Sequence, residues 1–197
     1  MVNRIALFLI LSLGAAVASA QQNERRRESS AELALSNDTL ELRYIGGGNM
    51  VGANRSSQVD GAFFLSEDRD IVLSAGLLFP TYELVDRLSI MIGPQVYAAL
   101  LNPENNDVLS ITLGLQARYV LLNRLGLAIS GKAFYGPDIL TFGAGDKLTD
   151  FSARAELPLA PRVMAFAGMR WFKFDLTEGS GSRTLQKEIF VGARYRF

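Results

Sequence analysis

The side chains that could do chemistry in this chain are carboxylates, amines, guanidinium groups and hydroxyls, because the sequence contains no histidine and no cysteine. Histidine is the commonest general base near neutral pH and the commonest metal ligand. A Ser-His or Asp-His catalytic centre is therefore excluded, and so is any disulfide. We expect a protein without enzymatic activity, catalytic residues, metal site or cofactor.

Acidic residues alone could still form a site. Asp138 and Asp146 fall in one expected loop, and Asp150 begins the strand after it. Paired carboxylates can bind a divalent cation or act as acid and base. Acids in exposed loops are more often solvated, so we expect no active site at these positions.

The elements that carry the charges are strands, because apolar and polar residues alternate from residue 31 to the C-terminus. The clearest run is Leu109, Ile111, Leu113, Leu115, Ala117 and Tyr119, set against Ser110, Thr112, Gly114, Gln116 and Arg118. About ten such strands of eight to twelve residues can be read, a length that crosses a bilayer when tilted. The alternation predicts an all-β, transmembrane, antiparallel up-and-down barrel. Eight strands, with residues 31–46 outside the wall, is the alternative.

One face of these strands carries both signs of charge together with many glycines. Its charged members are Glu41, Arg43, Arg118, Lys132, Arg154, Glu156, Arg170, Glu188 and Arg194. The opposite face is nearly free of charge across its centre, which lipid requires and water does not. A soluble lipocalin-like barrel would instead turn the apolar face inward around a ligand. We therefore expect the charged face to line a narrow lumen in which long side chains pair and plug the channel.

The chain divides into three parts. Residues 1–20 have the pattern of a secretory signal peptide, with Arg4, an apolar run and a small-residue cleavage site that leaves Gln21 first. Residues 21–30 form a polar N-terminal arm, and residues 31–197 form the barrel. Pro94 cannot donate a ladder hydrogen bond, so we expect a β-bulge at Gly93-Pro94.

The last strand has a distinctive end. Tyr195 and Phe197 close an apolar face, a pattern that resembles the C-terminal strand of bacterial outer-membrane barrels, which the barrel-assembly machinery reads. With that end in the periplasm, the loops at 67–69, 99–107, 136–147 and 175–184 face the cell exterior, and the turns at 121–124 and 158–162 face inward. Long outer loops and short inner turns are typical of this class. Tyr135 and Trp171 then fall near the outer rim, where aromatic girdles lie.

The region from Ala31 to Phe197 resembles the YfaZ family of small outer-membrane proteins. The segments that carry the resemblance are 135–142 (YGPDILTF), 151–157 (FSARAEL) and 190–197 (FVGARYRF). The resemblance implies an outer-membrane location and no catalytic residues.

These observations lead to a functional prediction. The 20 basic and 20 acidic residues balance, which argues against nucleic acid as a partner. We expect outer-membrane lipid, lipopolysaccharide, periplasmic chaperones and the barrel-assembly machinery as partners. The expected role is structural or loop-mediated, and a small porin-like diffusion channel for ions or solutes is the alternative.

Overall fold

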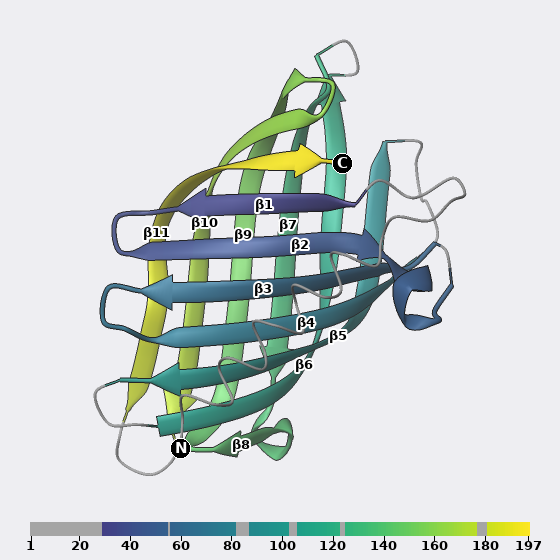
Figure 1. Ribbon diagram of the computed structural model, residues 1–197. Coiled ribbons are helices and arrows are strands. Elements are labelled where there is room, and N and C mark those ends of the chain that lie inside the picture. The colour runs from purple at the N-terminus through teal and green to yellow at the C-terminus, as the bar shows by residue number, and fades with distance from the viewer. Residues whose placement is uncertain (1–28, 55, 82–86, 103–105, 123–124, 177–180) are drawn as a thin grey trace.

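The chain folds into a closed β-barrel, seen in the computed structural model of Figure 1. The structure describes residues 29–54, 56–81, 87–102, 106–122, 125–176 and 181–197. The predicted signal peptide and almost all of the predicted polar arm lie outside the described residues. Among the residues described, no helix is long and apolar enough to cross a membrane.

Ten antiparallel strands form the wall. They are β1 (Ser30–Leu35), β2 (Thr39–Gly47), β3 (Gln58–Ser66), β4 (Ile71–Pro80), β5 (Leu88–Leu101), β6 (Asn106–Leu122), β7 (Leu127–Gly136), β9 (Gly145–Ala160), β10 (Val163–Leu176) and β11 (Ser182–Arg196). Each pairs with its neighbours in chain order, and β1 pairs with β11 to close the wall. The prediction of an up-and-down barrel with ten strands is confirmed.

Residues 31–46 belong to the wall. Strand β1 pairs with β2 on one side and with β11 on the other, where Ala31 lies opposite Tyr195. The eight-stranded alternative is therefore wrong. Closure leaves none of these ten strands with an unpaired edge, which is the condition for a sheet to cross lipid.

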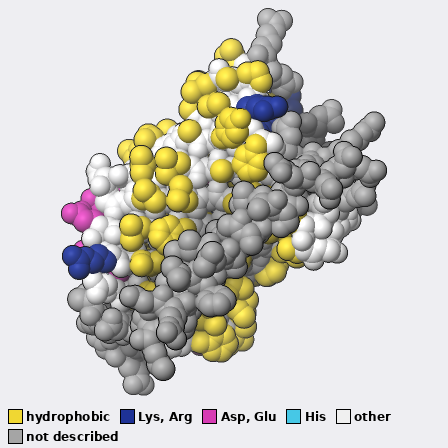
Figure 2. Space-filling model, viewed as in Figure 1, with side chains coloured by type: hydrophobic (Ala, Val, Ile, Leu, Met, Phe, Trp, Pro, Cys, Tyr) yellow, Lys and Arg dark blue, Asp and Glu magenta, His cyan; other side chains and the backbone are white. Residues whose placement is uncertain are grey.

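The outer wall is apolar. Ile189 is 71% exposed and Leu113 is 63% exposed, whereas Phe172, on the inward face of β10, is fully buried. Figure 2 shows hydrophobic side chains spread over the outside of the wall. The lipocalin-like arrangement is therefore wrong, because the apolar face points outward. A closed barrel with such an exterior fits the bacterial outer membrane, as predicted.

Two irregular regions differ from expectation. At Gly93-Pro94 the ladder between β4 and β5 is interrupted, yet Gly76 pairs with Gln95 and Phe79 with Ile92 in one unbroken register. No extra residue is inserted, so the expected bulge is wrong and a gap in the ladder accommodates the proline. Part of the expected loop at 136–147 has regular structure. It contains a short 3₁₀ helix, η3 (Asp138–Leu140), and a short strand, β8 (Thr141–Gly143), which pairs with β6.

The two ends of the barrel differ in their connections. We call the loop end the one with the β1–β2, β3–β4 and β10–β11 connections, and the turn end the one with the β9–β10 connection and Phe197. At the turn end, β2 leads into η2 (Gly48–Val51), another 3₁₀ helix. The strands of one wall cross those of the opposite wall in Figure 1, so side chains from strands distant in sequence meet in the lumen.

Candidate functional site

The lumen holds two groups of ion pairs. The first, the central cluster, consists of Glu41, Arg43, Asp60, Lys132, Asp150 and Arg170. The second, the Glu32 cluster, consists of Glu32, Arg118, Arg154, Glu156 and Arg194. Both are made by inward-facing residues of strands on opposite walls.

Asp150 is the hub of the central cluster. Its carboxylate is fully buried and accepts hydrogen bonds from Arg170 Nε at 2.8 Å and Nη2 at 2.9 Å. Lys132 Nζ donates to it at 3.1 Å and the Tyr97 hydroxyl at 2.9 Å. Arg170 also reaches across the lumen from β10 to Glu41 on β2. Three of the four donor atoms belong to cations, so these hydrogen bonds offset the free-energy cost of burying the charged carboxylate.

Glu41 links the two walls of the central cluster. Arg43, two residues further along β2, donates to it from Nε at 3.0 Å and from Nη2 at 2.9 Å. The other amine of that guanidinium lies 3.6 Å from Asp60 on β3. The central cluster thus contains three acids and three bases, and its charges balance.

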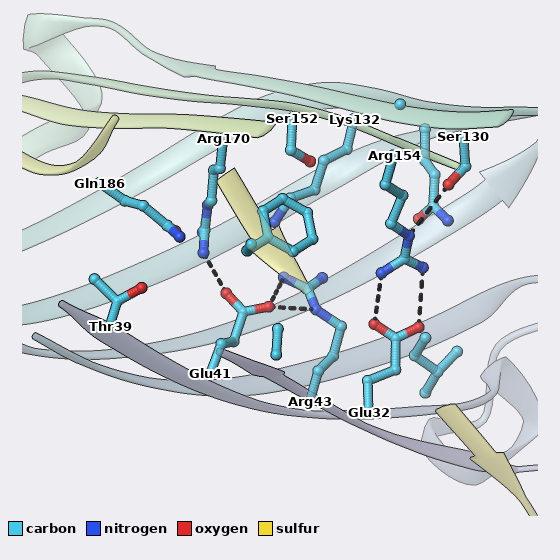
Figure 3. Close-up of a pocket in the computed structure, with 15 residues that line it drawn as sticks. Glu32, Thr39, Glu41, Arg43, Ser130, Lys132, Ser152, Arg154, Arg170 and Gln186 are labelled. Carbon is cyan, nitrogen blue, oxygen red and sulfur yellow. Dashed lines mark hydrogen bonds and ion pairs between the residues drawn. The ribbon is translucent and has the colours of Figure 1, made fainter. Parts of the chain in front are cut away.

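The Glu32 cluster is organised by Arg154 (Figure 3). The guanidinium forms a bidentate pair with Glu32, with distances of 2.9 and 3.0 Å. Its Nε also donates to Glu156 at 3.0 Å. It also stacks over Phe166 at 4.4 Å. Arg118 donates to the second oxygen of Glu156 at 2.8 Å. One arginine therefore joins β1, β9 and β10.

Little space remains between the two clusters. A cavity of about 50 Å³ lies there, lined by residues of both, with Gln116 and Gln186 among its walls. One buried water needs about 10–15 Å³ of such space, so the cavity has room for ordered water between the clusters.

Toward the loop end, the lumen is filled by apolar side chains. This apolar layer consists of Phe64, Val72, Tyr97, Ala99, Leu101, Val108, Leu148, Phe172, Phe174 and Leu185. Phe172 contacts Phe64 edge-on and lies against Phe174, each with ring centroids 5.5 Å apart. Arg170 stacks on the Phe172 ring at 4.4 Å, which joins the layer to the central cluster.

A third set of ion pairs lies at the loop-end rim. Arg183, at the start of β11, donates to Asp70 at 3.0 and 3.1 Å and to Asp68 at 3.0 Å. The same Asp70 accepts from the backbone amide of Asn102 at 2.9 Å. We call these contacts the rim clamp. They tie the β3–β4 connection to strands on both sides of it, across the mouth of the barrel.

Most of the residues predicted for the lumen enter these clusters. Glu41, Arg43, Lys132 and Arg170 belong to the central cluster, and Arg118, Arg154, Glu156 and Arg194 belong to the Glu32 cluster. Glu188 lies apart from both, where it accepts a hydrogen bond from Ser36 at 2.6 Å.

Three buried acids of these clusters were missing from the prediction. Glu32 and Asp60 have the same alternation phase as the other inward charges, and completing that phase would have found them. Asp150 was placed at the start of a strand and considered together with two loop acids. It is in phase with Ser152 and Arg154 and is fully buried. It therefore does not join Asp138 and Asp146 in a site.

Asp138 and Asp146 make local contacts. Asp138 accepts from the next backbone amide at 2.9 Å, and Asp146 lies 3.8 Å from Lys147. Across the described part of the chain, no group of three or more acids converges in a way that could hold a metal ion.

Comparisons with known proteins give structural likenesses alone. No family model and no curated protein matches the sequence. A solved structure titled "Bacterial polysaccharide outer membrane secretin" aligns with a TM-score of 0.54 and 13% identity, over 88% of this chain and 67% of that chain. The outer-membrane channel DcaP of Acinetobacter baumannii aligns with a TM-score of 0.43 and 11% identity, over 84% and 54%. The KdgM porin aligns with a TM-score of 0.46 and 9% identity, over 86% and 99%.

At this identity the first likeness establishes the fold, which is that of an outer-membrane β-barrel. The resemblance to the YfaZ family remains a prediction, because no family model matches.

Proposed function

We propose that this protein is a closed, non-conducting outer-membrane barrel that acts structurally or through its loop-end rim. The observation that carries the proposal is the filling of the lumen over two successive levels. The central cluster joins opposite walls by ion pairs, and the apolar layer packs directly on top of it through Arg170 and Phe172.

Physical chemistry supports a plug over a solute path. Barrels of about eight strands have interiors that side chains just fill, whereas open aqueous channels belong to barrels of about sixteen, and ten strands lie nearer the first size. Opening a path here would separate buried ion pairs, and removing one partner of such a pair costs about 3–5 kcal/mol. A path toward the loop end would also have to displace Phe172 and Phe174, both fully buried.

The proposal includes an orientation and an assembly route. The turn end, with Tyr195 and Phe197, would face the periplasm, where chaperones and the barrel-assembly machinery act on the last strand. Tyr195 and Phe197 stack with ring centroids 6.3 Å apart, and Phe197 also lies 6.3 Å from Tyr44. The loop end, with the rim clamp, would face the cell exterior and present the contact surface.

Conductance in planar bilayers tests the proposal against a small diffusion channel. The purified barrel, shown to be folded by heat-modifiable migration in detergent gels, is expected to give no steady ion-selective conductance. A channel would conduct, and its ion selectivity would change in Arg118→Ser and Arg170→Ser variants. Steady conductance of the wild-type protein with such a change would overturn the proposal of a plugged lumen.

A further inference from the structure

Lysines are distributed unevenly over this barrel. The sequence has four, at 132, 147, 173 and 187, and only Lys132 lies in the lumen. Lys173 stands between Phe172 and Phe174, both fully buried, so its side chain points outward. Lys147 precedes the fully buried Leu148 and points outward for the same reason. Lys187 is exposed on β11.

These three lysines lie on three adjacent strands near the loop end. Lys147 is on β9, Lys173 on β10 and Lys187 on β11, and β10 pairs with both of the others. Neighbouring strands are about 4.8 Å apart. Lys187 lies opposite Trp171 and Lys147 opposite Asp175, so the three lysines follow one another on the outer surface over residues 171–175 of β10. We call this surface the lysine patch.

Aromatic side chains border the lysine patch on the side of the membrane centre. Trp171 pairs with Phe151 on one side and with Lys187 on the other, and all three point outward. The Lys187 amine lies 5.7 Å from the centre of the Trp171 ring. Tyr135, on β7, is half exposed and continues this row of aromatics. Aromatic rings in such a row mark the level where the hydrocarbon core meets the headgroups.

The charges of the lysine patch are only partly compensated. Lys173 pairs with Asp175 at 2.7 Å, whereas Lys147 lies 3.8 Å from Asp146, a distance that gives a weak exposed pair. Within the described part of the chain no acid forms an ion pair with Lys187, whose amine lies over an aromatic ring. The outward face of these strands therefore carries an excess of positive charge, although the whole chain is neutral.

We propose that the lysine patch binds the phosphate groups of lipopolysaccharide in the outer leaflet. Lysine amines bind phosphates as point charges, and their long apolar stems let them rise from the lipid level to the headgroups. The row of aromatic rings places the amines at that level. The proposal rests on the proposed orientation in the membrane and is independent of the plugged lumen.

Retention of purified lipopolysaccharide by the folded barrel in mild detergent tests the site. The wild-type protein is expected to bind it more tightly than the same material after removal of its phosphates. Replacing Lys147, Lys173 and Lys187 by Gln should weaken binding about 125-fold, because each of the three charges removed contributes about fivefold. The matched control is Arg69→Gln with Arg87→Gln and Arg162→Gln, which removes three charges from turns outside the patch and should leave binding unchanged.

Heat-modifiable migration of every variant reports whether the barrel is folded. If the triple variant fails to fold, Lys187→Gln and the charge-conserving Lys187→Arg replace it, with an expected fivefold loss in the first and none in the second. Equal retention by wild type and patch variants would overturn the proposal, as would equal retention of phosphorylated and dephosphorylated material. A change in oligomeric state without a change in lipid retention would also overturn it and would assign the patch to protein contact. In each case the conductance result for the plugged lumen still stands by itself.

Discussion

Replacing Asp150 by Asn tests whether the central cluster holds the barrel together. The change keeps the shape of the side chain and removes its charge. Asp150 accepts four hydrogen bonds, and an amide can accept with only one oxygen while its nitrogen faces donors. The cluster would change from neutral to a net charge of +1, with Arg170 and Lys132 still buried. Removing one member of a buried ion pair costs about 3–5 kcal/mol, so we expect the free energy of unfolding to fall by that amount.

Urea unfolding of the barrel in lipid vesicles measures this loss. With a denaturant slope of about 2 kcal/mol per molar, the midpoint should fall by about 2 M. Asp146→Asn is the control, because this carboxylate on the same strand is 40% exposed, and surface changes are usually within about 0.5 kcal/mol. A midpoint for Asp150→Asn within the error of the control would refute the view that the cluster is a structural plug.

A second variant identifies the electrostatic part of the effect. Lys132 Nζ lies 3.1 Å from Asp150, so Lys132→Met in the Asp150→Asn background removes an unpaired buried cation. The double variant should be more stable than the sum of the single effects predicts, by about 0.5–3 kcal/mol for groups in contact. Strict additivity would mean that the loss comes from packing and that charge balance in the lumen has little effect.

Three further changes test other parts of the structure. Gly93→Ala should destabilise the barrel strongly in urea unfolding, because the added β-carbon would lie 2.0 Å from a carbonyl oxygen of β4. Gly61→Ala is the control and should be tolerated, because the nearest atom to its β-carbon would be 3.8 Å away. Arg183→Ala leaves Asp70 buried without its cation, so we expect the free energy of unfolding in urea to fall by about 1–3 kcal/mol. Proteolysis at the loop-end rim should also become faster, and an unchanged cleavage rate would show that the rim clamp is dispensable. Deleting Phe197 should lower the outer-membrane level in cells while the purified chain still refolds to the heat-modifiable form, and an unchanged level would argue against a role in assembly.

The strands and their faces could be predicted from the sequence because a membrane barrel imposes the same rule on every strand. Period-two alternation identified both strand positions and the apolar exterior, as in the β6 run ending at Tyr119. Turn chemistry was less informative. The loop expected at 136–147 forms η3 and β8. Strand β8 forms because its residues pair with β6, with Phe142 opposite Leu109. No local sequence signal specifies that tertiary pairing.

The partners within the lumen could not be predicted in the same way. Arg170 on β10 reaches Glu41 on β2, and Arg154 on β9 reaches Glu32 on β1, which are contacts between strands that do not pair with each other. Such contacts depend on the tilt and stagger of the closed wall, which alternation does not reveal. For Asp150 two sequence signals disagreed. Its alternation phase placed it on the inner face, whereas its position near a loop suggested an exposed acid.

The division between arginine and lysine follows from what each must do. Inside, one guanidinium can satisfy two carboxylates at once, as Arg154 does for Glu32 and Glu156. The rigid, planar guanidinium holds its donors in a fixed fork, so most of them find an acceptor within a narrow lumen. A lysine amine has no such fork. Outside, an amine on a flexible stem can follow the headgroups. Arg154 and Arg170 both join opposite walls. In the proposed plug, the contacts that would block a solute path are therefore also the ones that hold the walls together. A conducting form of this barrel would have to give up part of its stability.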